Sequence, residues 1–351
     1  MDKPRDKVFR RKDIVTRLPK QSSSYENDRS KENPRPKSRS VFTSSHAADD
    51  MQTRDILRYE GQLQRPYVPK PITVNNYFSE DYIDMYGDDG YNGGTGGTTI
   101  SPHGVITMRL REHIRVDVSL DRAVRVINAK NGIILALSAS GSSSGLVHPN
   151  GRVYQYGSRV EILANDAQEN DKFAKMWYKG VSFTSMQCAL VYLVDSAGTR
   201  TTTDSFSDLT HDFTLNIFYE DSPYSYIDTP NTTHATQLVN EAMAVLQSTT
   251  CWMTEDRTTN WIINNIRISQ TSDGLVRVGR NSNKYSLRTS PTNGSASVST
   301  PYMHCTGSMG QTRHLFVRRG ERRMHYDGST FIVRNAGHSA GFDEKHQLKV
   351  Y

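Results

Sequence analysis

The sequence predicts a mainly β protein, built from antiparallel meander or sandwich-like sheets with one packed α-helix and preceded by a disordered N-terminal arm. Short runs of β-branched and aromatic residues recur from residue 104 onward, separated by Gly, Asn and Asp. Only one stretch, after residue 233, has a helical hydrophobic period. The first hundred residues show no such period, and we therefore expect them to be disordered.

The strongest turn signal is Asn150-Gly151, which separates a run ending at His148 from one beginning at Arg152. Asn-Gly favours a two-residue hairpin turn in which both residues have positive φ. Connections this short join only antiparallel neighbours. The strands predicted before the helix are 105–110, 114–120, 123–128, 133–138, 145–148, 152–156, 159–163, 173–178, 181–184, 188–194, 199–203 and 213–219.

The predicted helix covers residues 234–248, where Leu238, Ala242 and Val245 recur at helical spacing. A lone amphipathic helix after a meander usually covers a face or an edge of the sheet. Strands are predicted to resume at 261–268, 275–278, 285–288, 314–318, 322–326, 330–334 and 347–351. The second block is expected to pack on the first.

These patterns divide the chain into five parts. They are a disordered basic arm (1–50), an extended acidic-aromatic and Gly-rich linker (51–103), an antiparallel β domain (104–222), a loop with the amphipathic helix (223–260) and a second β block (261–351).

The basic charge lies almost entirely in the arm. The chain has a net charge of +6, yet residues 1–40 alone hold a surplus of seven positive charges. Arg10, Arg11 and Lys12 form a basic cluster that could contact RNA, an import receptor or an acidic polymer such as the tubulin surface. The alternative is a solvated tail that keeps the protein soluble.

An acidic-aromatic segment follows the arm. Tyr77, Phe78, Tyr82 and Tyr86 alternate with carboxylates, and no Lys or Arg occurs between residues 75 and 100. The aromatic rings offer contact area while the carboxylates select a basic surface. Such a segment docks on a partner or folds back on its own domain, and plain disorder is the third possibility.

Arginines cluster near the C-terminal end. Arg318, Arg319, Arg322 and Arg323 flank Gly320, which predicts a tight hairpin. The arginines face water in the simplest interpretation. Basic residues interleaved with aromatics also bind acidic proteins or single-stranded nucleic acid.

No pattern typical of catalysis is present. Cys188, Cys251 and Cys305 lack metal-ligand spacing, and the neighbours His304 and Cys305 should point to opposite faces of a strand. Asp204, Asp208, His211 and Asp212 match no known metal-binding loop. We therefore predict no catalytic, cofactor-binding or metal-binding residue and no enzyme activity.

The chain shows neither a signal peptide nor an apolar window long enough for a membrane span.

Two stretches carry a family resemblance. The run 108–116 with the later His-Pro-Asn-Gly-Arg-Val-Tyr of 148–154, and the Thr-Arg-Thr-Thr-Thr of 199–203, resemble the β-hairpin modules of sperm and axonemal proteins associated with the central apparatus. The resemblance implies a structural role and supplies no catalytic residue. The Glu-rich tracts common in those proteins are absent.

The sequence thus favours a non-enzymatic structural or protein-interaction scaffold of the cilium or flagellum cytoskeleton. The alternative is a nuclear or germ-cell RNA-associated protein that uses the basic arm and the Arg-rich hairpins. The expected partner is a protein, with an acidic polymer or RNA bound through the arm and no membrane. The expected location is intracellular, in the cytoplasm or cytoskeleton, with the nucleus as the alternative.

Overall fold

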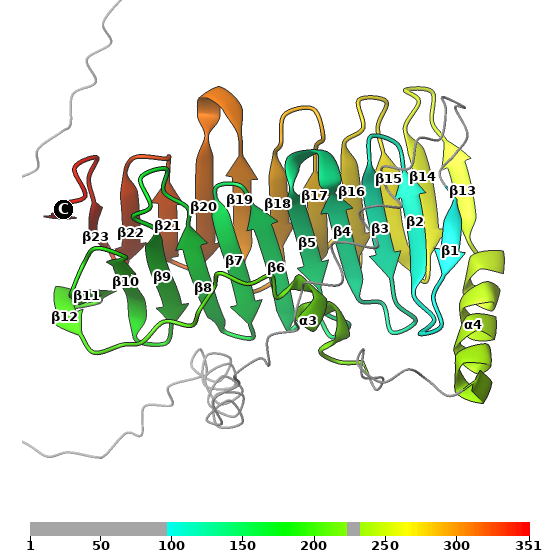
Figure 1. Cartoon of the computed structure of the whole chain (residues 1–351), viewed down its shortest axis with the longest axis horizontal. Coiled ribbons are helices and arrows are strands. Elements are labelled where there is room, and N and C mark those ends of the chain that lie inside the picture. Colours follow the sequence, from blue (N-terminus) through cyan, green and yellow to red (C-terminus); the bar gives the residue numbers. More distant parts are fainter. Residues whose placement is uncertain (1–96, 223–231) are drawn as a thin grey trace, which may run out of the picture. The chain divides into compact units, whose positions relative to one another are not determined.

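The computed structural model describes residues 97–222 and 232–351. Within this part the chain forms two antiparallel sheets of twelve strands each, sheet A and sheet B (Figure 1). Each strand pairs with its neighbours in sequence, so both sheets are meanders. The mainly β, antiparallel class predicted from the sequence is confirmed. The predictions made for the arm and the acidic-aromatic segment lie outside the described residues.

Sheet A contains β1 (Thr98–Ile100), β2 (Ile106–Leu110), β3 (Ile114–Val118), β4 (Val124–Asn128), β5 (Ile133–Leu137), β6 (Ser143–His148), β7 (Gly151–Tyr156), β8 (Arg159–Ala164), β9 (Lys172–Trp177), β10 (Gly180–Ser185), β11 (Val191–Asp195) and β12 (Gly198–Thr202). Sheet B contains β13 (Thr250–Met253), β14 (Thr259–Ile263), β15 (Ile266–Gln270), β16 (Val276–Arg280), β17 (Tyr285–Thr289), β18 (Ala296–Ser299), β19 (His304–Ser308), β20 (His314–Arg319), β21 (Arg322–Tyr326), β22 (Phe331–Asn335), β23 (His338–Phe342) and β24 (Leu348–Val350).

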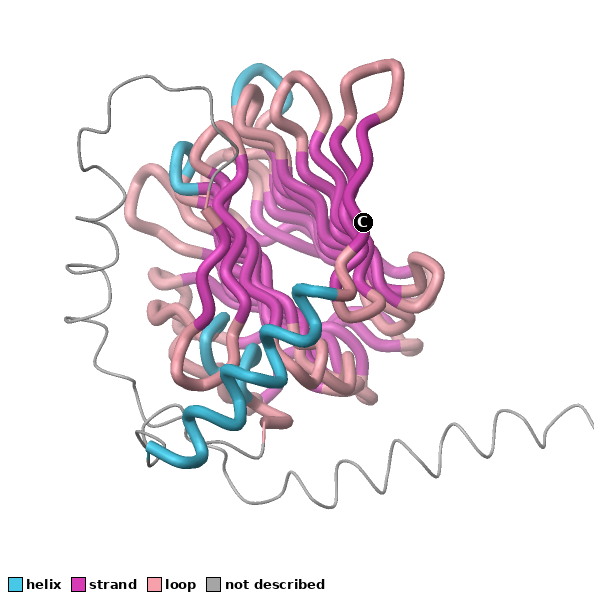
Figure 2. Tube along the Cα trace, turned by 90° about the vertical axis from the view of Figure 1, so that its right-hand side faces the viewer, coloured by secondary structure: helices cyan, strands magenta, loops and turns pink. Residues whose placement is uncertain are grey.

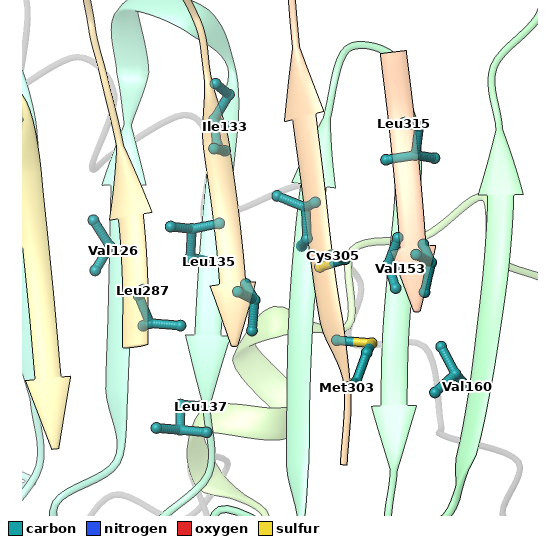
Figure 3. Packing of buried hydrophobic residues seen from close by; sticks show 14 of the residues in the cluster. Val126, Ile133, Leu135, Leu137, Val153, Val160, Leu287, Met303, Cys305 and Leu315 are labelled. Carbon is teal, nitrogen blue, oxygen red and sulfur yellow. The ribbon is translucent and has the colours of Figure 1, made fainter. Parts of the chain in front are cut away.

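The two sheets lie face to face as separate layers (Figure 2), and their inner faces form one continuous core. In most strands alternate residues point inward, which is the period-two pattern of a half-buried strand. Figure 3 shows Leu135 and Val153 of sheet A facing Leu287, Cys305 and Leu315 of sheet B. Each such fully buried aliphatic side chain contributes about 1.5–3 kcal/mol. This burial is what holds the two meanders together.

Polar contacts between the sheets lie among and around these apolar side chains. Asn128 donates to Thr289 Oγ1 at 3.0 Å, and Asn335 donates to the Val194 carbonyl at 3.1 Å. At one end of the sandwich, Asn264 donates to the Leu120 carbonyl at 2.9 Å. A buried amide needs a hydrogen-bond partner. The contacts made by Asn128 and Asn264 therefore hold β3 and β4 opposite β15 to β17.

A segment that we name the strap (residues 203–222) runs back across the outer face of sheet A. It ends in α3 (Thr214–Tyr219), whose Ile217 packs with Leu209 and Phe213 against Tyr154 on β7. The longer helix, α4 (Thr232–Gln247), lies at the end of the sandwich where β1 and β13 form the edges (Figure 1). Ala242 of α4 enters the main core, so this helix covers the open end of the sandwich.

The strand predicted at 213–219 is wrong, because these residues form α3. Phe213 and Ile217 are four residues apart and both reach the same small core, which is helical spacing. The Asp212 carboxylate also accepts the Thr214 N–H at 2.8 Å, which favours a helix start. The described residues therefore contain two α-helices where one was predicted.

The single strand predicted at 261–268 is also wrong, because β14 and β15 divide it. Asn264 and Asn265 have φ of 49° and 59° and form the turn. Asn adopts this left-handed conformation more readily than most residues, so an Asn-Asn pair can reverse the chain without Gly. The strands β1, β13, β18, β19 and β23 were not predicted, since their short runs contain Gly, Ser or Thr.

The turn after β6 differs from the predicted one. Gly151 has φ +146° and is already the first residue of β7, paired with His148, whereas Asn150 does not have positive φ. The turn therefore consists of Pro149 and Asn150. A Cβ on Gly151 would stand 2.0 Å from the Leu163 carbonyl oxygen, so this position requires glycine for space as well as for conformation.

Candidate functional site

The structure separates the predicted partner-binding residues into two groups. Arg10, Arg11, Lys12, Tyr77, Phe78, Tyr82 and Tyr86 lie outside the described residues. The Arg-rich hairpin is described, and it has the predicted form: β20 and β21 join through Gly320 and Glu321. Among the described residues, the candidate site therefore lies on sheet B.

The four arginines of this hairpin do not act together. Arg318 pairs with Arg323 in register and both are exposed on the outer face of sheet B. Arg319 and Arg322 form the next pair, on the opposite side of the strands, and are only half-exposed. Arg322 donates to the Tyr178 carbonyl of sheet A at 3.2 Å, and burial lowers the pKa of its guanidinium. The hairpin thus contributes two arginines to the outer face.

The outer row of arginines extends beyond the hairpin. Arg334 on β22 pairs with Arg323, so three arginines stand side by side across three strands. A second group lies nearer α4, where Arg277 pairs with Arg288 and Arg267 is on the adjacent strand β15. All six are exposed. We name this surface, formed by Arg267, Arg277, Arg288, Arg318, Arg323 and Arg334, the arginine face.

The charge of the arginine face is not compensated within the described residues. No strand of sheet B contains Asp or Glu. None of the six guanidinium groups forms an ion pair with a residue in the part of the chain that the structure describes. Like charges directly opposite each other destabilise a sheet. The rows therefore cost folding stability and expose guanidinium groups that lack an ion-pair partner among the described residues.

Apolar side chains accompany the arginines. Trp252 on β13 and Ile262 on β14 are 39% and 40% exposed on the same outer face. The Arg267 guanidinium lies 6.0 Å from the Trp252 ring centroid, within cation–π range. At the other end, Phe316 and Ile332 are half-buried beside the arginines. The arginine face thus offers fixed positive charge next to apolar contact area.

Sequence reasoning found Arg318 and Arg323 but missed Arg267, Arg277 and Arg288. The signal was present, since each of these three follows or separates buried residues in a period of two, as in Val276-Arg277-Val278. The pairing of Arg277 with Arg288 depends on register, and this emerged only from the fold.

The described residues contain no catalytic or metal-binding constellation. Cys305 is fully buried, which raises the pKa of its thiol to about 12, and His304 is exposed on the opposite face of β19. Asp204 accepts a hydrogen bond from Ser182, whereas His211 contacts the Asp208 carboxylate at 3.7 Å. No group of three potential metal ligands occurs among the described residues.

No described helix is long and apolar enough to cross a bilayer.

One hollow is present on the outer face of sheet A. It has a volume of about 290 Å³ and lies between the strap and β4 to β7, with Ile134, Val147, Arg152 and His211 in its lining. The Arg152 guanidinium donates to the Leu209 carbonyl of the strap at 2.8 Å. The polar groups in this hollow therefore hold the strap in place.

Fold and surface together define a two-sheet antiparallel meander with one basic outer face. The sequence matches the family described as "Domain of unknown function (DUF8796)" over residues 98–348, and the chain belongs to this family. No curated protein matches the sequence significantly.

Some solved structures have a limited similarity to this chain. The TCP10 domain of Danio rerio CPAP, solved in complex with a peptide of Danio rerio STIL, is 9% identical with a TM-score of 0.24, and the match covers 70% of this chain and 98% of that chain. The SAS-4 (dCPAP) TCP domain of Drosophila melanogaster, in complex with a proline-rich motif of Ana2 (dSTIL), is 8% identical with a TM-score of 0.13, covering 74% and 97%. Superpositions this poor carry no argument about function.

Proposed function

We propose that this protein is a non-enzymatic interaction scaffold that binds an acidic protein surface through the arginine face. The observation that carries the proposal is the register of exposed, unpaired arginines across sheet B. A folded protein that keeps destabilising like-charge pairs gains nothing from them by itself, whereas an acidic partner would turn each into a favourable contact. Arginine is also suited to bidentate contacts with carboxylates.

The arginine face fits an acidic protein better than single-stranded RNA. RNA bound on a sheet needs aromatic rings on which successive bases stack. Between the two groups of arginines, the outer positions carry Ser286, Ser297, Ser299 and Thr306, with His304 beside them. Small hydroxyl side chains provide no stacking platform there, and the rings of Trp252 and Phe316 lie apart, at the two ends of the arginine face. The RNA-associated alternative therefore rests mainly on the basic arm.

The cellular setting that we propose is the cytoskeleton of the cilium or flagellum, where the tubulin surface is an extended acidic polymer. The arginine face and the basic arm would both favour such a polymer, because charge complementarity steers association. Imaging of a tagged copy tests this setting. Accumulation in the nucleus, with no signal on the axoneme, would contradict it.

The binding test compares two double substitutions of equal charge change. Arg277→Glu with Arg288→Glu alters the arginine face, whereas Arg109→Glu with Arg200→Glu alters exposed arginines of sheet A. We expect the first pair to weaken binding to polyglutamate and to microtubules by about tenfold or more, since a contacted charge pair contributes on the order of 1.5 kcal/mol.

The control pair should leave binding within about twofold, as remote charges contribute little once screened. Thermal unfolding of all variants shows that they remain folded. Equal losses for both pairs would mean that net charge alone drives binding, and single-stranded RNA bound more tightly than polyglutamate would favour the alternative function.

A further inference from the structure

The end of the arginine face nearest α4 combines charge with exposed apolar surface. Trp252 and Ile262 lie there on edge strand β13 and on β14, and Arg267, Arg277 and Arg288 occupy the next strands. Exposed apolar side chains that lie together and are rimmed by polar groups mark an interaction site, and Trp252 and Ile262 beside the arginines form such a surface. A suitable occupant would carry both carboxylates and aromatic rings.

One segment of this chain has that composition. Residues 75–91 contain Glu80, Asp81, Asp84, Asp88 and Asp89 together with five aromatic residues, and they contain no Lys or Arg. They lie outside the described residues, so only their sequence enters the argument. The six residues that connect them to β1 include four glycines.

The point of attachment lies close to the arginine face. β1 is the edge strand of sheet A at the end that α4 covers, and β13 is the edge strand of sheet B at the same end (Figure 1). The contacts at this end confirm the alignment, since Gln270 at the end of β15 donates to the Arg111 carbonyl between β2 and β3 at 2.8 Å. The chain thus enters the sandwich beside the apolar end of the arginine face.

We propose that residues 75–91 dock in cis on the arginine face between Trp252 and Arg288. This inference rests on the function proposed above and adds its regulation, because the docked segment would occupy the surface that the acidic partner needs. Aromatic side chains of the segment would pack on Trp252 and Ile262, and its carboxylates would pair with the exposed guanidinium groups. A partner would have to displace the segment.

The length of the segment and its effective concentration both allow it to dock on the arginine face. The path from β1 over the edge at β13 to Arg288 on β17 crosses one sheet spacing and four strand spacings, about 30 Å. The 23 residues from 75 to 97 can span about 75 Å when extended. A short tether provides an effective concentration on the order of millimolar, so even a weak ionic contact would be populated.

Binding of polyglutamate to the full-length chain tests the proposal. The test variant combines Glu80→Gln, Asp81→Asn, Asp84→Asn, Asp88→Asn and Asp89→Asn, which removes the charge of the segment and keeps its shape. If the segment occupies the arginine face nine-tenths of the time, the variant should bind polyglutamate about tenfold more tightly than the wild type. Adding Arg277→Glu and Arg288→Glu should remove this gain.

The outcomes separate the two proposals. Equal binding by the wild type and the variant, lost in both when the two arginines are replaced, overturns docking in cis and leaves the proposed function intact. Failure of every chain to bind overturns the proposed function, and docking is then decided by cross-linking alone.

Cross-linking uses the full-length chain with Tyr82 replaced by a photoreactive benzoyl-phenylalanine. We expect cross-links at the mass of one chain, into β13 to β17. Cross-links at the mass of two chains would show a second copy as the occupant, and cross-links elsewhere, or none, would refute docking on this face.

Discussion

The outer faces of the two sheets differ in what covers them. The strap crosses sheet A and buries Tyr154 with Leu209 and Ile217 in a small second core. No described segment crosses the outer face of sheet B, and its arginines are exposed. The two sheets have the same strand number and the same meander order. The difference therefore lies in the segments that follow each sheet and in the outward-facing side chains.

The two outer faces also differ in the contacts that their cations make. On sheet A, Arg125 contacts the Asp212 carboxylate of the strap at 3.6 Å and donates to Thr214 Oγ1 at 3.2 Å. Lys175 donates to the Ser205 carbonyl at 2.8 Å. On sheet B the arginines stand opposite one another. The cations of sheet A beneath the strap thus stabilise the fold, whereas the six arginines of the arginine face form no ion pair with a described residue.

The largest expected effect concerns the covered face. Tyr154→Ala should lower the free energy of unfolding by about 3–5 kcal/mol, because it opens a cavity under the strap and removes a buried ring. Phe316→Ala, on the uncovered face of sheet B, is the control and should cost about 1 kcal/mol or less. Denaturant unfolding measures both, and similar losses would show that the strap does not stabilise sheet A.

The next effect concerns the cation under the strap. Arg125→Met keeps the aliphatic stem but leaves Asp212 without its cation, so we expect a loss of about 1–3 kcal/mol. Limited proteolysis of residues 203–222 should become faster in parallel. If the melting temperature and the cleavage rate are both unchanged, the ion pair does not anchor the strap.

Acid should protonate hydrogen-bonded carboxylates beside both sheets and so lower the stability of the fold. Hydrogen bonds from the Thr210 side chain and backbone lower the pKa of Asp208 in the strap. Burial alone would raise the pKa of Asp327 in the turn between β21 and β22, but hydrogen bonds from Thr330 and Ser329 lower it to about 2.

Because both folded-state pKa values lie below the unfolded value, their contribution to stability is complete above about pH 4 and is lost as the pH falls toward about 2. The melting temperature measured against pH should therefore drop in this window. Asp327→Asn should flatten part of the drop, and an unchanged profile in this variant would contradict the assignment.

The smallest expected effect has the opposite sign. Arg288→Ser removes a like charge opposite Arg277 and should raise the free energy of unfolding by about 0.2–1 kcal/mol. The matched change Arg109→Ser on sheet A should be neutral, because its cross-strand neighbour Arg115 is paired with Asp117 at 2.8 Å. A clear destabilisation by Arg288→Ser would mean that this arginine serves the fold rather than a partner.

Local patterns predicted most strands and the position of α4. Runs such as Ile114-Arg115-Val116 alternate cleanly because one side faces the core. The secondary-structure predictions were wrong where a turn lacked Gly, as at Asn264-Asn265, or where a helix was too short for its hydrophobic period to show, as in α3. Strands rich in Ser and Gly, such as β18 and β19, were missed because their inner positions are small.

The sequence by itself determined the antiparallel class, the hairpin at Gly320 and the charge of each outward position, since these follow from turn chemistry and a period of two. Tertiary structure decided which arginines become neighbours, because cross-strand pairs such as Arg277 and Arg288 depend on register. It also decided that the strap crosses the outer face of sheet A, whereas no described segment crosses that of sheet B. That choice rests on contacts between residues as distant as Tyr154 and Ile217, which only packing brings together.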